Sequence, residues 1–337
     1  SSNYEALDVD VKEIPKHGSI EEQLIFFLRY AILAPSSHNC QPWSFSVRNN
    51  IISVFLESER VLSVSDPNAL LAHIAIGCAI ENIDIAANFF GFDVSMDLFP
   101  DDTRPNFIAN LNFTKSSEVI INNDHLIFFI PTRRSNRTPY ENRIPEIQFF
   151  NSLLAQSSEN VQVSVITDHS TKNNIADLII QWRLDLFNDQ SFRQELFQYK
   201  RNNFTTSHTG MPGFTMGFSN LTSLFIPFLI KHFNVLRLSK EKDLQLLKHQ
   251  TPAFVIISSM HNTKQDALKV GQVFERCIVE AERSNIQTSI STIPRNNTAL
   301  QSLLETKFYP QIFFRLGYTN EKARHSPRFN LMQVLNS

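Results

Sequence analysis

Apolar side chains recur at helical spacing over residues 20–33, and this spacing predicts an amphipathic helix. Pro35 follows and ends the helix, because its ring and missing N–H cannot continue the hydrogen-bond ladder. Residues 43–47 then alternate between apolar and polar side chains, as a half-buried strand does. A second strand is predicted at 51–56, joined to the first by a hairpin turn at 48–50.

Two longer stretches follow one pattern. Residues 70–90 carry apolar side chains at helical spacing and end at Gly91, a residue suited to the left-handed conformation that closes a helix. Residues 270–286 repeat the pattern without a gap, and each stretch holds a glycine near its start, Gly77 or Gly271. A glycine inside a helix costs roughly 1 kcal/mol relative to alanine, so we expect Gly77 to face a close neighbour. The likeness indicates an internal duplication.

Composition describes a globular protein. The chain has 337 residues, of which 42% are hydrophobic and 19% are charged, so it can build one large or two ordinary domains. Continuous apolar runs at 254–257 and 312–318 predict strands buried on both faces. A net charge of −2 offers no electrostatic case for nucleic acid as a partner.

The cysteines and the apolar runs bear on location. Cys40, Cys78 and Cys277 show neither a metal-binding spacing nor a disulfide framework, so we expect buried free thiols in a reducing compartment, the cytoplasm. The most apolar run, 221–230, is short and interrupted, and no membrane span is predicted. No signal peptide is visible, and residues 1–19 are expected to form a loose arm.

Polar side chains are concentrated in two segments. Residues 34–45 read Ala-Pro-Ser-Ser-His-Asn-Cys-Gln-Pro-Trp-Ser-Phe and can offer several hydrogen-bonding groups to a polar ligand. The same residue types favour turns, so a plain helix-to-strand connection is the alternative. Residues 133–137 read Arg-Arg-Ser-Asn-Arg, and their guanidinium and hydroxyl groups can bind a phosphate monoester. A solvated basic face is the alternative there.

The loop motif, together with the preceding Arg29, resembles the flavin-contacting segment of the nitroreductase family of FMN-dependent oxidoreductases. The segment 133–137 is similar to the one that holds the FMN phosphate in that family, and Arg328 corresponds to the family's C-terminal phosphate arginine. The resemblance covers roughly residues 20–335 and implies FMN as the cofactor. The cofactor contacts that it implies are Pro35, Ser36, Ser37, Asn39, Gln41, Arg133, Arg134, Ser135, Arg137, Ser291 and Arg328.

The distribution of the motifs implies a fused arrangement. Ordinary members of the family are homodimers in which one chain supplies the phosphate arginines and the other supplies the Pro-Ser-Ser loop. Here the first half carries the loop and the second half carries the arginines, whereas residues 156–161 lack the Pro-Trp that a second loop would need. This resembles the two-repeat nitroreductase-like proteins of the Acg type, with one complete flavin site.

The resemblance therefore implies an α+β, nitroreductase-like fold. We expect a tandem pseudo-dimer of two α/β halves around central antiparallel sheets and long packed helices. The expected divisions are an arm at 1–19, one half at 20–120 and the other at 121–337. Association of the whole chain into a homodimer stays open.

Residues 201–235 have no counterpart in simple family members. Glycines alternate there with large apolar side chains, and this pattern suggests a lid over a cavity. A core-packing insertion and a membrane-surface segment are the alternatives. The family's usual Glu-Gly pair is also absent near residues 289–292.

Two functions follow from the resemblance. The first is an oxidoreductase in which NAD(P)H reduces FMN and leaves, after which a small electron-poor acceptor, such as a nitroaromatic or a quinone, is reduced. The second is a lidded protein that sequesters FMN with little turnover, which the insertion and the missing Glu-Gly pair favour. In either case the flavin carries the redox chemistry and no catalytic side chain is expected. The sequence contains none of the common metal-binding or nucleophile motifs.

Overall fold

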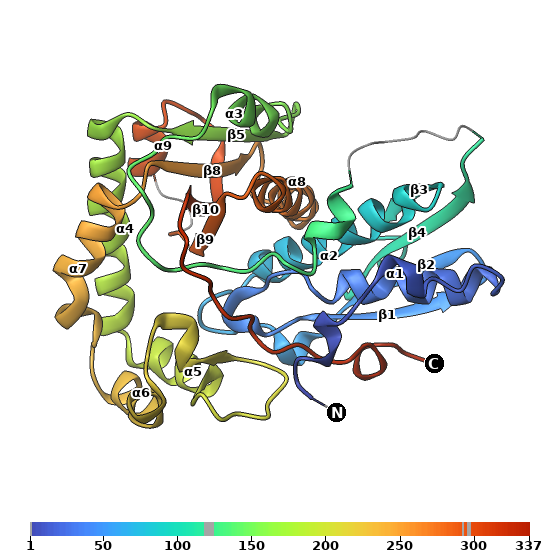
Figure 1. Ribbon diagram of the computed structural model, residues 1–337, viewed down its shortest axis with the longest axis horizontal. Helices are drawn as coiled ribbons and strands as arrows, with labels where there is room; N and C mark the ends of the chain where they lie inside the picture. Colours follow the sequence, from blue (N-terminus) through green and yellow to red (C-terminus); the bar gives the residue numbers. More distant parts are fainter. Residues whose placement is uncertain (1, 118–124, 292, 295–297) are drawn as a thin grey trace.

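The protein contains two four-stranded antiparallel sheets, each accompanied by a long helix (Figure 1). The computed structural model describes residues 2–117, 125–291, 293–294 and 298–337. The first half contains α1 (Ile20–Ala31), β1 (Trp43–Arg48), β2 (Ile51–Leu56), α2 (Leu70–Phe89), β3 (Phe92–Leu98) and β4 (Phe107–Lys115). The predicted α+β class is confirmed.

The rest of the chain contains a second set of helices and strands. Its helices are α3 (Ile147–Leu154), α4 (His169–Asn188), α5 (Gln190–Tyr199), α6 (Asn220–His232), α7 (Leu236–His249), α8 (Lys264–Arg283) and α9 (Thr298–Leu303). Its strands are β5 (Val161–Ile166), β6 (Lys200–Arg201), β7 (Met211–Pro212), β8 (Ala253–Ser259), β9 (Gln287–Ser291) and β10 (Tyr309–Gly317). The short strands β6 and β7 pair in parallel.

The two sheets have the same connectivity. Their strand orders are β1-β2-β4-β3 and β5-β8-β10-β9, so the strand that comes last in sequence lies inside each sheet. In both, a long helix connects the second strand to the third: α2 in one half and α8 in the other. The shared order supports the two-repeat interpretation. The expected boundary between the halves, at residues 120–121, lies outside the described residues.

The central helices α2 and α8 touch through their backbones. A Cβ on Gly77 would lie 2.1 Å from the carbonyl oxygen of Leu268, and one on Gly271 would lie 2.0 Å from that of Ile74. The close neighbour expected for Gly77 is therefore confirmed. By length and composition α2 could cross a bilayer, but 89% of its most apolar stretch is buried inside the protein. It is the core helix of the first half.

The second half carries extra chain at a specific position. In the first half β1 and β2 are joined by a two-residue turn, with Arg48 paired to Ile51. The equivalent connection between β5 and β8 holds residues 167–252, which form α4 to α7 on one side of the molecule (Figure 1). The insertion is therefore longer than the expected 201–235.

The N-terminal arm is ordered, so the prediction of a loose arm is wrong. The Asn3 side-chain amide donates to the carbonyl oxygens of Thr205 (3.2 Å) and Ser207 (3.0 Å), which tie the arm to the insertion. The backbone N–H of Arg328 donates to the carbonyl of Asn3 at 2.9 Å. Long-range partners that no local pattern reveals account for this order.

Candidate functional site

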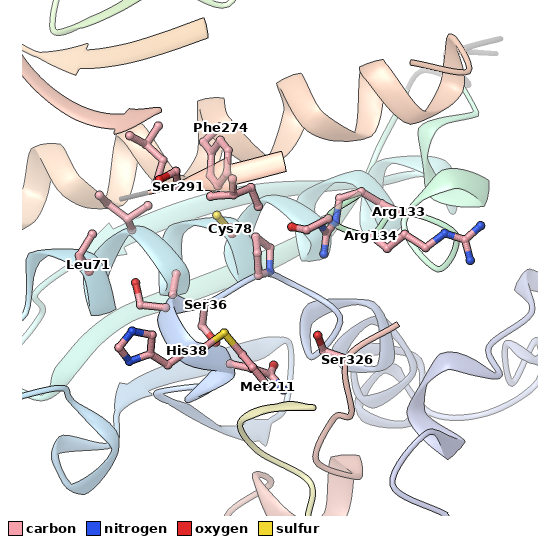
Figure 2. A pocket seen from close by; sticks show the side chains of 18 of the residues that line it. Ser36, His38, Leu71, Cys78, Arg133, Arg134, Met211, Phe274, Ser291 and Ser326 are labelled. Carbon is pink, nitrogen blue, oxygen red and sulfur yellow. The ribbon is translucent and has the colours of Figure 1, made fainter. Parts of the chain in front are cut away.

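A cavity of about 260 Å³ lies between the two halves of the protein (Figure 2). Its walls come from the loop after α1, from α2 and α8, from the segment 133–137 and from the segment 324–328. Ten of the eleven predicted cofactor residues line this cavity: Pro35, Ser36, Ser37, Asn39, Arg133, Arg134, Ser135, Arg137, Ser291 and Arg328. Gln41 does not line it.

The loop after α1 folds back on itself. His38, Asn39 and Gln41 all have positive φ angles of 52°, 55° and 52°, and Asn and His tolerate this conformation better than most residues. The backbone N–H of Gln41 donates to the Ser36 hydroxyl at 2.9 Å and closes the turn. As a result, Ser36, Ser37 and His38 line the cavity, while the Gln41 side chain lies outside it.

Asn39 and Gln41 anchor the loop to distant segments. The Asn39 amide donates to the carbonyls of Gly210 (3.0 Å) and Pro327 (2.8 Å). Gln41, which is fully buried, donates to the carbonyl of His208 at 2.8 Å and accepts from the backbone of Phe329 at 3.0 Å. Because protein groups occupy both amides, their main role here is to join the loop to the insertion and to the C-terminal segment.

The cavity is strongly cationic. Its arginines are Arg133, Arg134, Arg137, Arg324 and Arg328. Among the described lining residues there is no aspartate or glutamate. An anionic ligand would therefore be favoured over a neutral one of the same shape.

Arg328 lies at the buried end of this arginine cluster. It donates to the Asn39 side-chain oxygen at 3.1 Å and to the carbonyl of Pro327 at 3.0 Å. Burial, followed by the nearby charge of Arg133, lowers the pKa of Arg328 to about 9. Within the described part of the chain, the buried Nε atoms of Arg133 and Arg328 have no hydrogen-bond partner. Buried, unsatisfied cationic groups are costly, so these residues fit a phosphate.

Glu275 of α8 is a fully buried carboxyl close to the two arginines. Burial raises the pKa of Glu275 to about 7, and the positive charge of Arg133 offsets part of that rise. Below that pH the carboxyl is mostly protonated, and it does not neutralise the arginines. Below about pH 7 the arginine cluster therefore keeps its full positive charge for a ligand, and above it the carboxylate offsets one of these charges.

The opposite part of the cavity is apolar. Cys78 of α2 and Phe274 of α8 face the space, and Ser36 and Met211 lie across from them (Figure 2). Burial raises the pKa of the Cys78 thiol well above its usual value, so this sulfur contributes as an apolar group. A planar aromatic ligand with an anionic tail would match this division between an apolar and a cationic part.

Part of the insertion completes the cavity wall. Met211 lines the cavity, and Arg137 donates to the carbonyl of Thr215 at 3.1 Å. The guanidinium of Arg324 lies 3.7 Å from the ring centre of Phe214. Arg137 is exposed to solvent and lines the cavity, and desolvation by the nearby protein lowers the pKa of its guanidinium.

Some lining residues are not among the cofactor contacts predicted from the sequence, although Met211 belongs to the predicted lid. They are His38, Leu71, Ile74, Ala75, Cys78, Met211, Phe274, Ile290, Ile312, Arg324, His325 and Ser326. Arg324 could have been found as a further basic residue just before the Ser-Pro-Arg motif at 326–328. Cys78 and Phe274 each lie close in sequence to a helix glycine, Gly77 or Gly271, and only the packing of the two helices identifies them.

Comparison with known proteins supplies the context. No model of a protein family matches the chain. A Mycobacterium tuberculosis protein named "Putative NAD(P)H nitroreductase acg" is 22% identical over 306 residues, which cover 89% of this chain and 90% of the relative. An uncharacterized protein of the same organism is 22% identical over 298 residues, covering 85% and 84% of the two chains. The first of these relatives confirms the resemblance to Acg-type nitroreductase-like proteins.

Solved structures give shorter matches. A Bacteroides fragilis nitroreductase with bound FMN is 12% identical, with a TM-score of 0.38, and the match covers 61% of this chain and 95% of that one. An iodotyrosine deiodinase bound to FMN and 3-iodo-L-tyrosine is 13% identical, with a TM-score of 0.35 and the same two coverages.

Proposed function

We propose that the cavity between the halves binds one FMN and that the protein is an NAD(P)H-dependent flavin oxidoreductase. The observation that carries the proposal is the combination of five arginines and an apolar wall in one cavity whose described lining has no carboxylate. The resemblance to relatives named as NAD(P)H nitroreductases supports it.

The residues divide into two groups by the part of the ligand they would hold. Arg133, Arg134, Ser135 and Arg328 would bind the phosphate, because guanidinium groups match phosphate oxygens bidentately. The loop residues from Pro35 to Asn39 would lie along the ribityl chain and the ring. When bound, FMN supplies hydride-transfer chemistry through its ring system. Ser291, at the end of β9, would approach the ring with its backbone.

Arg137 would act on the charge of the ring. Its guanidinium reaches the cavity and is fixed by a hydrogen bond to Thr215. A fixed positive charge at this position favours an anionic form of a ligand over its neutral form. The apolar side chains of Met211 and Phe274 would exclude water from the same region. The electron acceptor is proposed to be a small electron-poor molecule, such as a nitroaromatic or a quinone.

One observation favours the second candidate, FMN sequestration under a closed lid. The insertion is fastened to the loop after α1 by a reciprocal pair of hydrogen bonds: Asn39 donates to the carbonyl of Gly210, and Gly210 donates to that of Asn39 at 3.3 Å. Such fastening would slow the exchange of NAD(P)H for an acceptor. The two candidates predict the same cofactor but different turnover.

Two measurements separate these proposals. Titration of the purified chain with FMN and with riboflavin should give about one FMN per chain and much weaker riboflavin binding, since riboflavin lacks the phosphate. Anaerobic stopped-flow mixing of the FMN complex with NADPH or NADH should then bleach the flavin within seconds. Tight FMN binding without bleaching over minutes would favour sequestration, and a failure to bind FMN would overturn both proposals.

A further inference from the structure

The exposed apolar surface of this protein is concentrated in the insertion. Of the sixteen large hydrophobic side chains that are exposed among the described residues, eight lie between residues 204 and 238. They are Phe204, Leu221, Leu224, Phe225, Phe228, Leu229, Phe233 and Leu238. We call α6 with these flanking side chains the α6 surface. A concentration of this kind marks an interaction site.

Helix α6 carries apolar side chains on both its inner and its outer face. Its inner face packs Ile226 and Ile230 against Phe192 and Leu196 of α5. Its outer face presents Leu221, Leu224, Phe225, Phe228 and Leu229 at the spacing of one helical stripe. Phe225 is 60% exposed and Phe228 is 59% exposed. The inner face fixes the helix to the protein, and the outer face is exposed.

Within the stretch of sequence that carries this surface, the charged residues have one sign. No aspartate or glutamate occurs between Glu195 and Glu241, although the whole chain has a net charge of −2. The same stretch contains Arg201, Lys231, Arg237 and Lys240, all at least partly accessible. A stripe of Phe and Leu beside basic side chains is the pattern of a helix that lies on an anionic membrane.

The geometry distinguishes lying on a bilayer from crossing it. Helix α6 has 13 residues and is followed by α7 at a bend of 108°. A helix of this length does not reach across the hydrocarbon core, which needs about 20 residues. Figure 1 places α6 at one corner of the molecule, where a flat surface can meet it.

We propose that the α6 surface docks the protein onto anionic phospholipid membranes. Phe225, Phe228 and their neighbours enter the boundary between headgroups and acyl chains, and the basic side chains contact lipid phosphates. This binding is peripheral and reversible. It does not depend on the proposed FMN function, because none of the exposed α6 side chains lines the cavity.

The test is co-sedimentation of the full chain with vesicles. Wild-type protein should bind vesicles of phosphatidylcholine containing a quarter phosphatidylglycerol, and bind pure phosphatidylcholine vesicles more weakly, with binding reduced by added salt. The variant F225D/F228D should lose about tenfold or more in partitioning, because it places two carboxylates on the inserted face. The matched control is I144D/I147D, which changes two exposed isoleucines of another surface and should bind like wild type.

Circular dichroism and urea unfolding of both variants show whether each remains folded, which exposed positions should permit. Unchanged vesicle binding of folded F225D/F228D, or equal loss in I144D/I147D, would overturn the proposal. Sedimentation velocity tests the alternative that a second copy of this chain covers the α6 surface. If wild type fails to bind vesicles and forms a dimer that F225D/F228D abolishes, the surface joins two copies of this chain and the membrane proposal is wrong.

Discussion

Gly77 and Gly271 face each other across the contact between α2 and α8, so closely that a Cβ on Gly77 would lie 3.0 Å from the Cα of Gly271. The contact joins the two halves at their central helices. Cys78 and Phe274, which follow the two glycines in sequence, line the proposed FMN cavity. The spacing of these helices therefore sets the width of the cavity.

The first prediction concerns this contact. At an exposed position inside a helix, replacing glycine by alanine raises the free energy of unfolding by roughly 1 kcal/mol. Gly77→Ala should instead lower the free energy of unfolding by roughly 1–3 kcal/mol, because the new methyl meets the backbone oxygen of Leu268. Urea unfolding measures the change. Gly271→Ala should act in the same direction, and the double variant should cost less than the sum of the two, since one separation of α2 from α8 makes room for both methyl groups. A stabilised Gly77→Ala would contradict the packing.

The second prediction concerns the phosphate. Arg133→Ala should leave the fold intact and weaken FMN binding by about 1.5–3 kcal/mol, as expected for the loss of a charged hydrogen bond. Riboflavin binding should change far less. Fluorescence titration with both ligands measures the difference. Arg48→Ala, at an exposed position of the first hairpin, is the control and should bind FMN like wild type. An equal loss for both ligands would show that Arg133 does not hold the phosphate.

Much of the fold follows from short-range pattern. The expected helix at 20–33 is α1, the expected hairpin joins β1 to β2, and the helix expected to close at Gly91 is α2. Gly91 has a φ of 79°, as the sequence predicted for the residue that closes α2, and Asn285, at the equivalent place after α8, has one of 57°. Local periodicity and turn chemistry determine these features, so one sequence is enough to find them.

The rest depends on contacts between distant residues. Gln41 was expected at the cofactor, yet its partners are His208 and Phe329, which no local motif indicates. The bounds of the insertion also follow only from the sheet topology, because the equivalence of the β1–β2 and β5–β8 connections shows where the insertion begins. Glu275 lies in an ordinary helical pattern, and its position close to the arginines appears only when α8 is placed.

The third prediction concerns pH. The pKa of Glu275 is raised to about 7 in the folded protein from an ordinary value of 4.5, chiefly by burial. Between those two pH values the folded state holds a proton that the unfolded state has lost, so this carboxyl destabilises the fold as pH rises. The contribution of Glu275 to the free energy of unfolding should fall by up to about 3 kcal/mol from pH 4.5 to 7 and stay constant above pH 7.

Comparison with Glu275→Gln isolates this group from the others around it, which are Arg133, Arg328, Asn82 and Glu81. Urea unfolding without ligand should show that wild type loses stability relative to the variant as pH rises from 5 to 7.5. Glu81, whose pKa is also raised to about 7 by burial, is present in both proteins, so its own titration is common to both and only its repulsion of Glu275 enters the difference. A constant difference between the two proteins across this range would mean that Glu275 does not titrate there.

The last prediction concerns the proposed lid. Asn39→Ala removes the hydrogen bonds to the carbonyls of Gly210 and Pro327 and the contact that Arg328 makes with its side-chain oxygen. Residues 208–216 should then separate more often from the loop after α1. Hydrogen exchange of their amides should speed up, and iodide quenching of bound flavin should rise. The cost in unfolding free energy should be roughly 1–3 kcal/mol.

A matched variant distinguishes loss of the fastening from general destabilisation. Asn50→Ala also removes an amide that donates to a distant carbonyl, that of Phe113 at 3.0 Å, but in the first hairpin. It should lower stability without changing exchange at 208–216 or quenching of the flavin. If both variants alter that segment equally, or neither does, then Asn39 does not hold the lid. The reciprocal hydrogen bonds with Gly210 would in that case give no support to sequestration. The oxidoreductase proposal would then be favoured, with an insertion that does not slow turnover.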